Sequence, residues 1–127
     1  MKAHFILFVA DQQRSTEFYS SVLGIAPSLE VPGMTEFSIG ETAILGLMPQ
    51  EGIVRLLGGT IADPALAHEI PRCEVYLVVE DPDRFHERAL AAGASDLSPL
   101  SLRDWGHIAA YCSDLDGHVL AFACPAA

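Results

Sequence analysis

The chain has 127 residues, half of them apolar and 19% charged, which suits one globular domain and argues against disorder. Seven Lys and Arg against 17 Asp and Glu give a net charge of −10, which argues against nucleic acid as a partner. No apolar run approaches the roughly 20 residues of a membrane helix, and run 5–10 is too short for a signal peptide. We therefore expect a cytoplasmic protein without a membrane partner.

The first half of the chain alternates strand and helix signals. Residues 4–10 are rich in β-branched and aromatic side chains and predict a strand. Asp11 predicts the N-cap of a helix, and Gly24 predicts its end. Weaker strand signals follow at 28–31, 36–39 and 42–48, with turns at 32–33 and 40–41 between them.

A connector follows over residues 50–72, where Gly and Pro interrupt every regular pattern. Residues 54–57 could form a short helix or a short strand within it. The glycines at 58 and 59 lack the signature of a phosphate-binding loop.

The opening pattern then returns over residues 73–127. A strand is predicted at 74–79, and Asp81 followed by proline predicts a helix start, with Gly93 at the end. Further strands are predicted at 95–98, 107–113 and 118–124, with a tight turn at 114–117. The three cysteines, at 73, 112 and 124, are odd in number and form no CxxC pair, which argues against a zinc knuckle or a disulfide framework.

Strand, Asp-capped helix and glycine stop thus occur twice, at 4–24 and at 74–93. The sequence predicts an α+β fold with two tandem βαβββ modules, about 1–49 and about 73–127, in one domain over residues 1–127. A single βαβββ unit leaves one sheet face uncovered, so two units are expected to pair.

Two motifs carry a resemblance to a known family. The first comprises His4, Leu7, Val9, Asp11, Ser15, Phe18, Tyr19, Val22, Leu23 and Gly24. The second comprises residues 114–118 and 119–122, preceded by Trp105 and Gly106. Together they resemble the vicinal-oxygen-chelate superfamily: glyoxalase I, fosfomycin-resistance enzymes, extradiol dioxygenases and bleomycin-resistance proteins. The resemblance implies a curved mixed sheet around a central cavity, commonly in a homodimer.

The resemblance also implies four inward-facing metal-ligand positions, two in each module. On this sequence they fall on His4, near Gly46, on Glu74 and on Ala121. Gly46 and Ala121 have no donor atom, whereas a catalytic divalent ion generally takes about three protein ligands. We therefore expect no cofactor; the alternative is a divalent metal on His4 and Glu74, with His107 as a third donor.

Strand alternation extends these positions into a predicted ligand-binding wall. Its members are His4, Ile6, Phe8, Glu74, Tyr76, Trp105, His107, Tyr111 and Ala121. By resemblance Trp105 forms an aromatic lid, and the alternative is an ordinary structural tryptophan. A buried Glu74 would need a partner, which could be His4, a ligand cation or water.

The opposite strand faces are expected to pack under the helices. They carry Phe5, Leu7, Val9, Val75, Leu77 and Val79. His86, on the second helix, is expected to be exposed.

Three functional hypotheses remain open. The first is a metal-free small-molecule-binding protein resembling bleomycin-resistance proteins, with an aromatic or cationic ligand in the central cavity. The second is a metal-dependent lyase, isomerase or dioxygenase of the glyoxalase type with non-standard ligands. The third is a degenerate module whose dimer serves assembly or regulation. No catalytic residue is assigned, because no nucleophile with a positioned base is visible.

Overall fold

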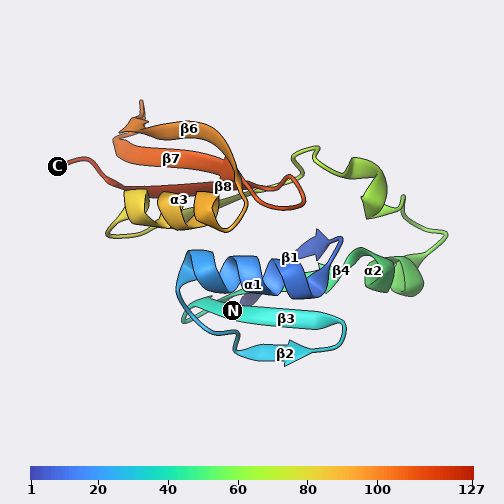
Figure 1. Cartoon of the computed structure of the whole chain (residues 1–127). Helices are drawn as coiled ribbons and strands as arrows, with labels where there is room; N and C mark the ends of the chain where they lie inside the picture. The colour runs from blue at the N-terminus through green and yellow to red at the C-terminus, as the bar shows by residue number, and fades with distance from the viewer. The chain divides into compact units, whose positions relative to one another are not determined.

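The computed structural model describes all 127 residues, which divide into two compact units, Met1–His68 and Glu69–Ala127 (Figure 1). The first unit contains β1 (Ala3–Val9), α1 (Gln12–Leu23), β2 (Leu29–Val31), β3 (Met34–Gly40), β4 (Ala43–Pro49), α2 (Gln50–Leu57) and the short 3-10 helix η1 (Pro64–Ala67). The second contains β5 (Glu74–Val78), α3 (Pro82–Ala91), β6 (Ser95–Leu102), β7 (His107–Ser113) and β8 (Val119–Pro125). The predicted α+β class with tandem βαβββ modules is confirmed.

Each unit forms one four-stranded mixed sheet, and the two sheets have equivalent strand orders, β1-β4-β3-β2 and β5-β8-β7-β6. In both, the first strand pairs in parallel with the last, and the remaining pairs are antiparallel. A parallel pair needs a crossover connection, which begins with α1 in one unit and with α3 in the other.

The helix boundaries follow from local capping. Asp11 accepts a hydrogen bond from the backbone N–H of Arg14 (3.0 Å), and Asp81 accepts one from that of Arg84 (3.1 Å). Gly24 ends α1 in the left-handed conformation, with φ at 69°. The predicted helix starts and the Gly24 stop are therefore confirmed.

One face of each sheet is packed under a helix. In the first unit α1 packs on β3 and β4, and the ring of Tyr19 lies 6.5 Å from that of Phe37. In the second unit α3 packs on β6, β7 and β8, and the rings of Phe85 and Phe122 lie 5.8 Å apart. Because side chains alternate along a strand, the opposite face of each sheet displays a separate set of residues.

The sequence predictions that His86 is exposed and that Phe5 is buried are both wrong. His86 is 6% exposed, because it follows Pro82 by four residues and precedes Ala89 by three, which places all three on the buried face of α3. Phe5 is 60% exposed, although Leu7 and Val9 on the same face of β1 are buried. Phe5 lies near the start of an edge strand, where neighbouring side chains cover a large ring less completely.

The connector is more ordered than its glycines and prolines suggest. Residues 54–57, for which the sequence allows a short helix or a short strand, form the end of helix α2. No helix of the chain has the length and apolar character needed to cross a membrane. The single-domain organisation and the central cavity stay predictions.

Candidate functional site

An aromatic cluster on the second unit brings together three of the predicted ligand-binding residues. The indole N–H of Trp105 donates a hydrogen bond to the hydroxyl of Tyr76 (2.9 Å). The same hydroxyl lies 2.6 Å from Nδ1 of His107. The rings of Tyr76 and His107 are stacked, with centroids 5.7 Å apart. Residues from β5, from β7 and from the turn before β7 thus form one connected polar and aromatic group.

The turn that carries Trp105 is held from both sides. The backbone N–H of Arg103 donates to the carbonyl of His107 (2.8 Å), and that of Ala126 donates to the carbonyl of Gly106 (2.9 Å). Gly106 has φ at 86°, a conformation that favours glycine. The indole therefore projects from a turn that backbone hydrogen bonds close.

Arg103 fastens this turn to the neighbouring strands. Its guanidinium donates to the carbonyl of Ala109 (2.8 Å) and to the hydroxyl of Ser98 (2.9 Å). It also lies over the ring of Tyr111, 5.1 Å from the centroid. Arg103 was not among the residues predicted from the sequence, although its position two residues before Trp105 was an available signal.

Tyr111 and Ala121 lie on the same sheet face as the cluster. Ala121 is paired with Tyr76 on one side and with Tyr111 on the other, so a buried methyl group separates two tyrosines. Partial burial raises the pKa of the Tyr111 hydroxyl, and the negative charge of Glu74 raises it further. Glu74 itself is exposed, so the expectation of a buried carboxylate is wrong, because Glu74 lies at the start of the edge strand β5.

The first unit places His4, Ile6 and Phe8 on the sheet face away from α1, as strand alternation predicts. Nδ1 of His4 lies 3.5 Å from a carboxylate oxygen of Glu36 on β3. Glu36 was not among the residues predicted from the sequence. Its signal was the alternation along β3, which separates Glu36 from the buried Thr35 and Phe37.

The four metal-ligand positions implied by the resemblance do not form a sufficient donor set. Gly46 and Ala121 offer no ligand atom, which leaves His4 and Glu74. Glu36 adds a carboxylate near His4, but from β3 and not from β4. One such pair is fewer than the roughly three protein ligands of a typical catalytic site.

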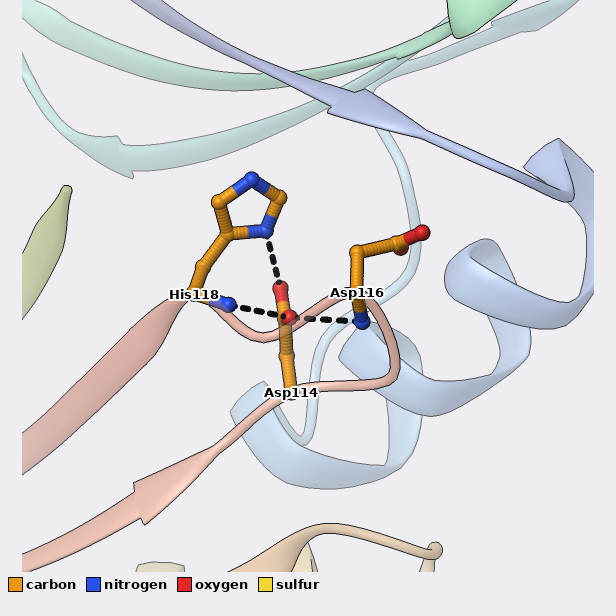
Figure 2. Close-up of side chains that lie close together, drawn as sticks. All are labelled: Asp114, Asp116 and His118. Carbon is orange, nitrogen blue, oxygen red and sulfur yellow. Dashed lines mark hydrogen bonds and ion pairs between the residues drawn. The ribbon is translucent and has the colours of Figure 1, made fainter. Parts of the chain in front are cut away.

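A second group of potential metal ligands occupies the turn between β7 and β8, where Asp114, Asp116 and His118 place ligand atoms within 4.8 Å of one another (Figure 2). One oxygen of Asp114 accepts from the backbone N–H groups of Asp116 and His118, both at 2.9 Å. Its other oxygen lies 2.8 Å from Nδ1 of His118, whose Nε2 lies 3.0 Å from the Arg72 guanidinium. Because the guanidinium can only donate, Nε2 accepts and Nδ1–H donates to Asp114. Hydrogen bonds within the protein thus occupy Asp114 and His118, so we interpret this group as a hydrogen-bonded cluster that stabilises the turn.

An open groove of about 1040 Å³ lies on the first unit, on the side of α1 and β2. Four carboxylates line it, from Asp11, Glu17, Glu30 and Glu51, with no Lys or Arg among the lining residues. None of the predicted ligand-binding residues belongs to it. The groove and the aromatic cluster are therefore separate features of the chain.

The two βαβββ units with equivalent topology place this chain in the class of proteins built from two such modules. The chain belongs to the Glyoxalase/Bleomycin resistance protein/Dioxygenase superfamily, whose family profile matches residues 3–122. Comparison with curated protein sequences gave no match.

Solved structures support the same fold at low sequence identity. A glyoxalase-related enzyme from Fulvimarina pelagi is 22% identical, with a TM-score of 0.82 over 98% of this chain and 87% of that chain. A glyoxalase/bleomycin resistance protein/dioxygenase family enzyme from Burkholderia phytofirmans PsJN is 17% identical, with a TM-score of 0.76 over 96% of each chain. TioX from Micromonospora sp. ML1 is 21% identical, with a TM-score of 0.68 over 98% of each chain. These likenesses concern the fold.

Proposed function

We propose that this protein binds a small aromatic or cationic molecule at the cluster of Tyr76, Trp105 and His107, in the manner of metal-free bleomycin-resistance proteins. The observation that carries the proposal is that the indole of Trp105 is exposed and yet held in one orientation. Trp105 is 56% exposed although its indole N–H is hydrogen-bonded and its turn is closed. An exposed indole held in one orientation provides a stacking surface whose ordering cost is already met in the free protein.

Charge favours a cation at this surface. Glu74 is exposed on the sheet face that also carries Tyr76, and the chain has a net charge of −10. The faces of Trp and Tyr rings attract cations through their quadrupoles. Arg103 adds a positive charge nearby, but its guanidinium is engaged by backbone carbonyls and the Tyr111 ring.

The proposal is tested with benzyltrimethylammonium, an aromatic cation, by following the emission of Trp105, the chain's single tryptophan. We expect saturable quenching or a spectral shift. By calorimetry, Trp105→Ala weakens binding by more than about 1 kcal/mol, the scale of one aromatic contact. Phe5→Ala, which removes an exposed ring from the first unit, is the control and leaves affinity unchanged. Equal affinity in Trp105→Ala and the wild type contradicts the proposal.

The second candidate is a metal-dependent lyase, isomerase or dioxygenase with non-standard ligands. The observation in its favour is the pair of His4 and Glu36, whose imidazole and carboxylate lie 3.5 Å apart. These side chains would hold the metal, and a divalent ion would supply Lewis-acid chemistry to a bound oxygen atom. Metal content distinguishes the two candidates.

A further inference from the structure

The hydrogen bonds of the aromatic cluster have a defined direction. An indole N–H can only donate, so Tyr76 accepts from Trp105. The single hydroxyl proton of Tyr76 then remains to be placed. Nδ1 of His107, at 2.6 Å, is the remaining hydrogen-bond partner of this hydroxyl. Tyr76 therefore donates to Nδ1.

The reverse direction leaves a group without a partner. If Nδ1–H of His107 donated to Tyr76, the hydroxyl would accept twice and its own proton would have no acceptor in the protein. An unmade hydrogen bond in a partly buried site costs more than a made one contributes. The chain from Trp105 through Tyr76 to His107 is therefore the arrangement in which the indole proton and the hydroxyl proton both have an acceptor within the protein.

This direction determines where the neutral imidazole carries its proton. A ring nitrogen that accepts a hydrogen bond has no proton, so the proton of neutral His107 lies on Nε2. Nε2 makes no hydrogen bond within the protein, and no buried side-chain nitrogen or oxygen lacks a partner, so Nε2 is open to solvent.

We infer that His107 is a specificity-determining residue, which offers a fixed N–H donor to a hydrogen-bond acceptor on the ligand. The inference rests on the proposed function and names the ligand more closely. The ligand is an aromatic cation that carries an acceptor, such as a carbonyl oxygen conjugated to its ring. Stacking on Trp105 places the ring, and the Nε2–H of His107 selects the acceptor.

The inference is tested with two probes of similar shape: benzyltrimethylammonium with a para-acetyl group and the same cation with a para-isopropyl group. We expect the acetyl probe to bind wild-type protein about five-fold more tightly, the effect of one neutral hydrogen bond. His107→Asn, whose amide reaches only the position of Nδ1, abolishes the preference. His107→Gln, whose amide reaches the position of Nε2, retains part of it.

The protonation of the ring is measured independently by nitrogen NMR of the imidazoles of the full chain near pH 8. We expect a protonated Nε2 and a bare, hydrogen-bonded Nδ1. In Tyr76→Phe, the Nδ1 resonance moves toward that of a free pyridine-type nitrogen. A protonated Nδ1 in the wild type overturns the inference whatever the probes do.

The two proposals fail in different ways. Equal binding of both probes overturns the role of His107 and leaves the proposed function standing. Binding of neither probe contradicts the proposed function, and the NMR result then decides the hydrogen-bond direction alone. Binding that is insensitive to Trp105→Ala and to His107→Asn places the probes elsewhere, and this overturns both proposals.

Discussion

Glu36 on β3 lies directly opposite Gly46 on β4, and its carboxylate lies 3.5 Å from Nδ1 of His4 on β1. The β4 position implied as a ligand by the resemblance thus holds a glycine. A Cβ added at Gly46 would lie 3.2 Å from the Ile6 side chain and 3.3 Å from the sulfur of Met34, so its immediate surroundings are apolar. The first unit keeps a histidine–carboxylate pair but draws the carboxylate from another strand.

The first prediction concerns metal content. We expect purified protein to carry no stoichiometric divalent metal. In the first unit the pair of His4 and Glu36 provides two ligands, whereas a catalytic site generally has about three protein ligands. Elemental analysis checks this, and a chelator is expected to leave the thermal transition unchanged. About one equivalent of metal, lost in both His4→Ala and Glu36→Gln, would instead establish the metal-dependent candidate.

The second prediction compares two glycines that both have positive φ. A Cβ at Gly117, where φ is 92°, would overlap the backbone of Glu69, whereas a Cβ at Gly106, where φ is 86°, meets nothing within 4 Å. Gly106→Ala is expected to cost about 1 kcal/mol of unfolding free energy, from backbone conformation alone. Gly117→Ala is expected to cost about 3 kcal/mol or more of unfolding free energy, because the backbone of Glu69 cannot move aside as a flexible side chain could. Urea denaturation measures both, and similar costs would show that the contact with Glu69 is unimportant.

The third prediction concerns the hydrogen-bonded cluster at the β7–β8 turn. Asp114→Ala removes the acceptor of two backbone N–H groups and of His118, all buried, so we expect a loss of about 3 kcal/mol. Asp63→Ala is the matched control, since Asp63 also accepts from a backbone N–H two residues later but is exposed. We expect it to cost less than about 1 kcal/mol. Equal losses in denaturant titrations would refute a special role for this turn.

The fourth prediction follows from Cys112. Burial raises the pKa of its thiol to about 12, and the charges of Asp114 and Asp96 act in the same direction. Because the pKa is higher in the folded state, the stabilisation is complete below about pH 9 and is lost as the pH rises toward 12, by up to about 4 kcal/mol. Unfolding measured across this range is expected to depend less on pH in Cys112→Ala than in the wild type. Cys124→Ala serves as the control, and an unchanged profile in Cys112→Ala would count against the prediction.

The fifth prediction is a homodimer. Each sheet ends in strands whose outer edge has no partner within that sheet, namely β1 and β2 in one unit and β5 and β6 in the other. Open edges invite further pairing with another chain. Light scattering is expected to give twice the 13.6 kDa chain mass. A monomer mass over a wide concentration range would contradict it.

The periodic features of the fold could be predicted from the sequence. Strand alternation, the aspartate caps of α1 and α3, and Gly24 each depend on a few neighbouring residues, so local chemistry is sufficient to place them. The internal repeat then indicated two equivalent units. The prediction for His86 was wrong because its burial depends on packing against β7, where Nε2 of His86 lies 3.2 Å from the carbonyl oxygen of Tyr111.

The sequence by itself determined the modules, their order and the strand faces on which the candidate residues lie, because these depend on local periodicity and capping. Only the tertiary structure decided which side chains meet. Tyr76 and His107 are 31 residues apart in the chain, yet their 2.6 Å contact depends on β5 and β7 both being placed by β8. The pairing of His4 with Glu36 likewise depends on the register of β1 and β3 against β4. Such contacts follow from strand order and register, which are long-range properties that no local pattern encodes.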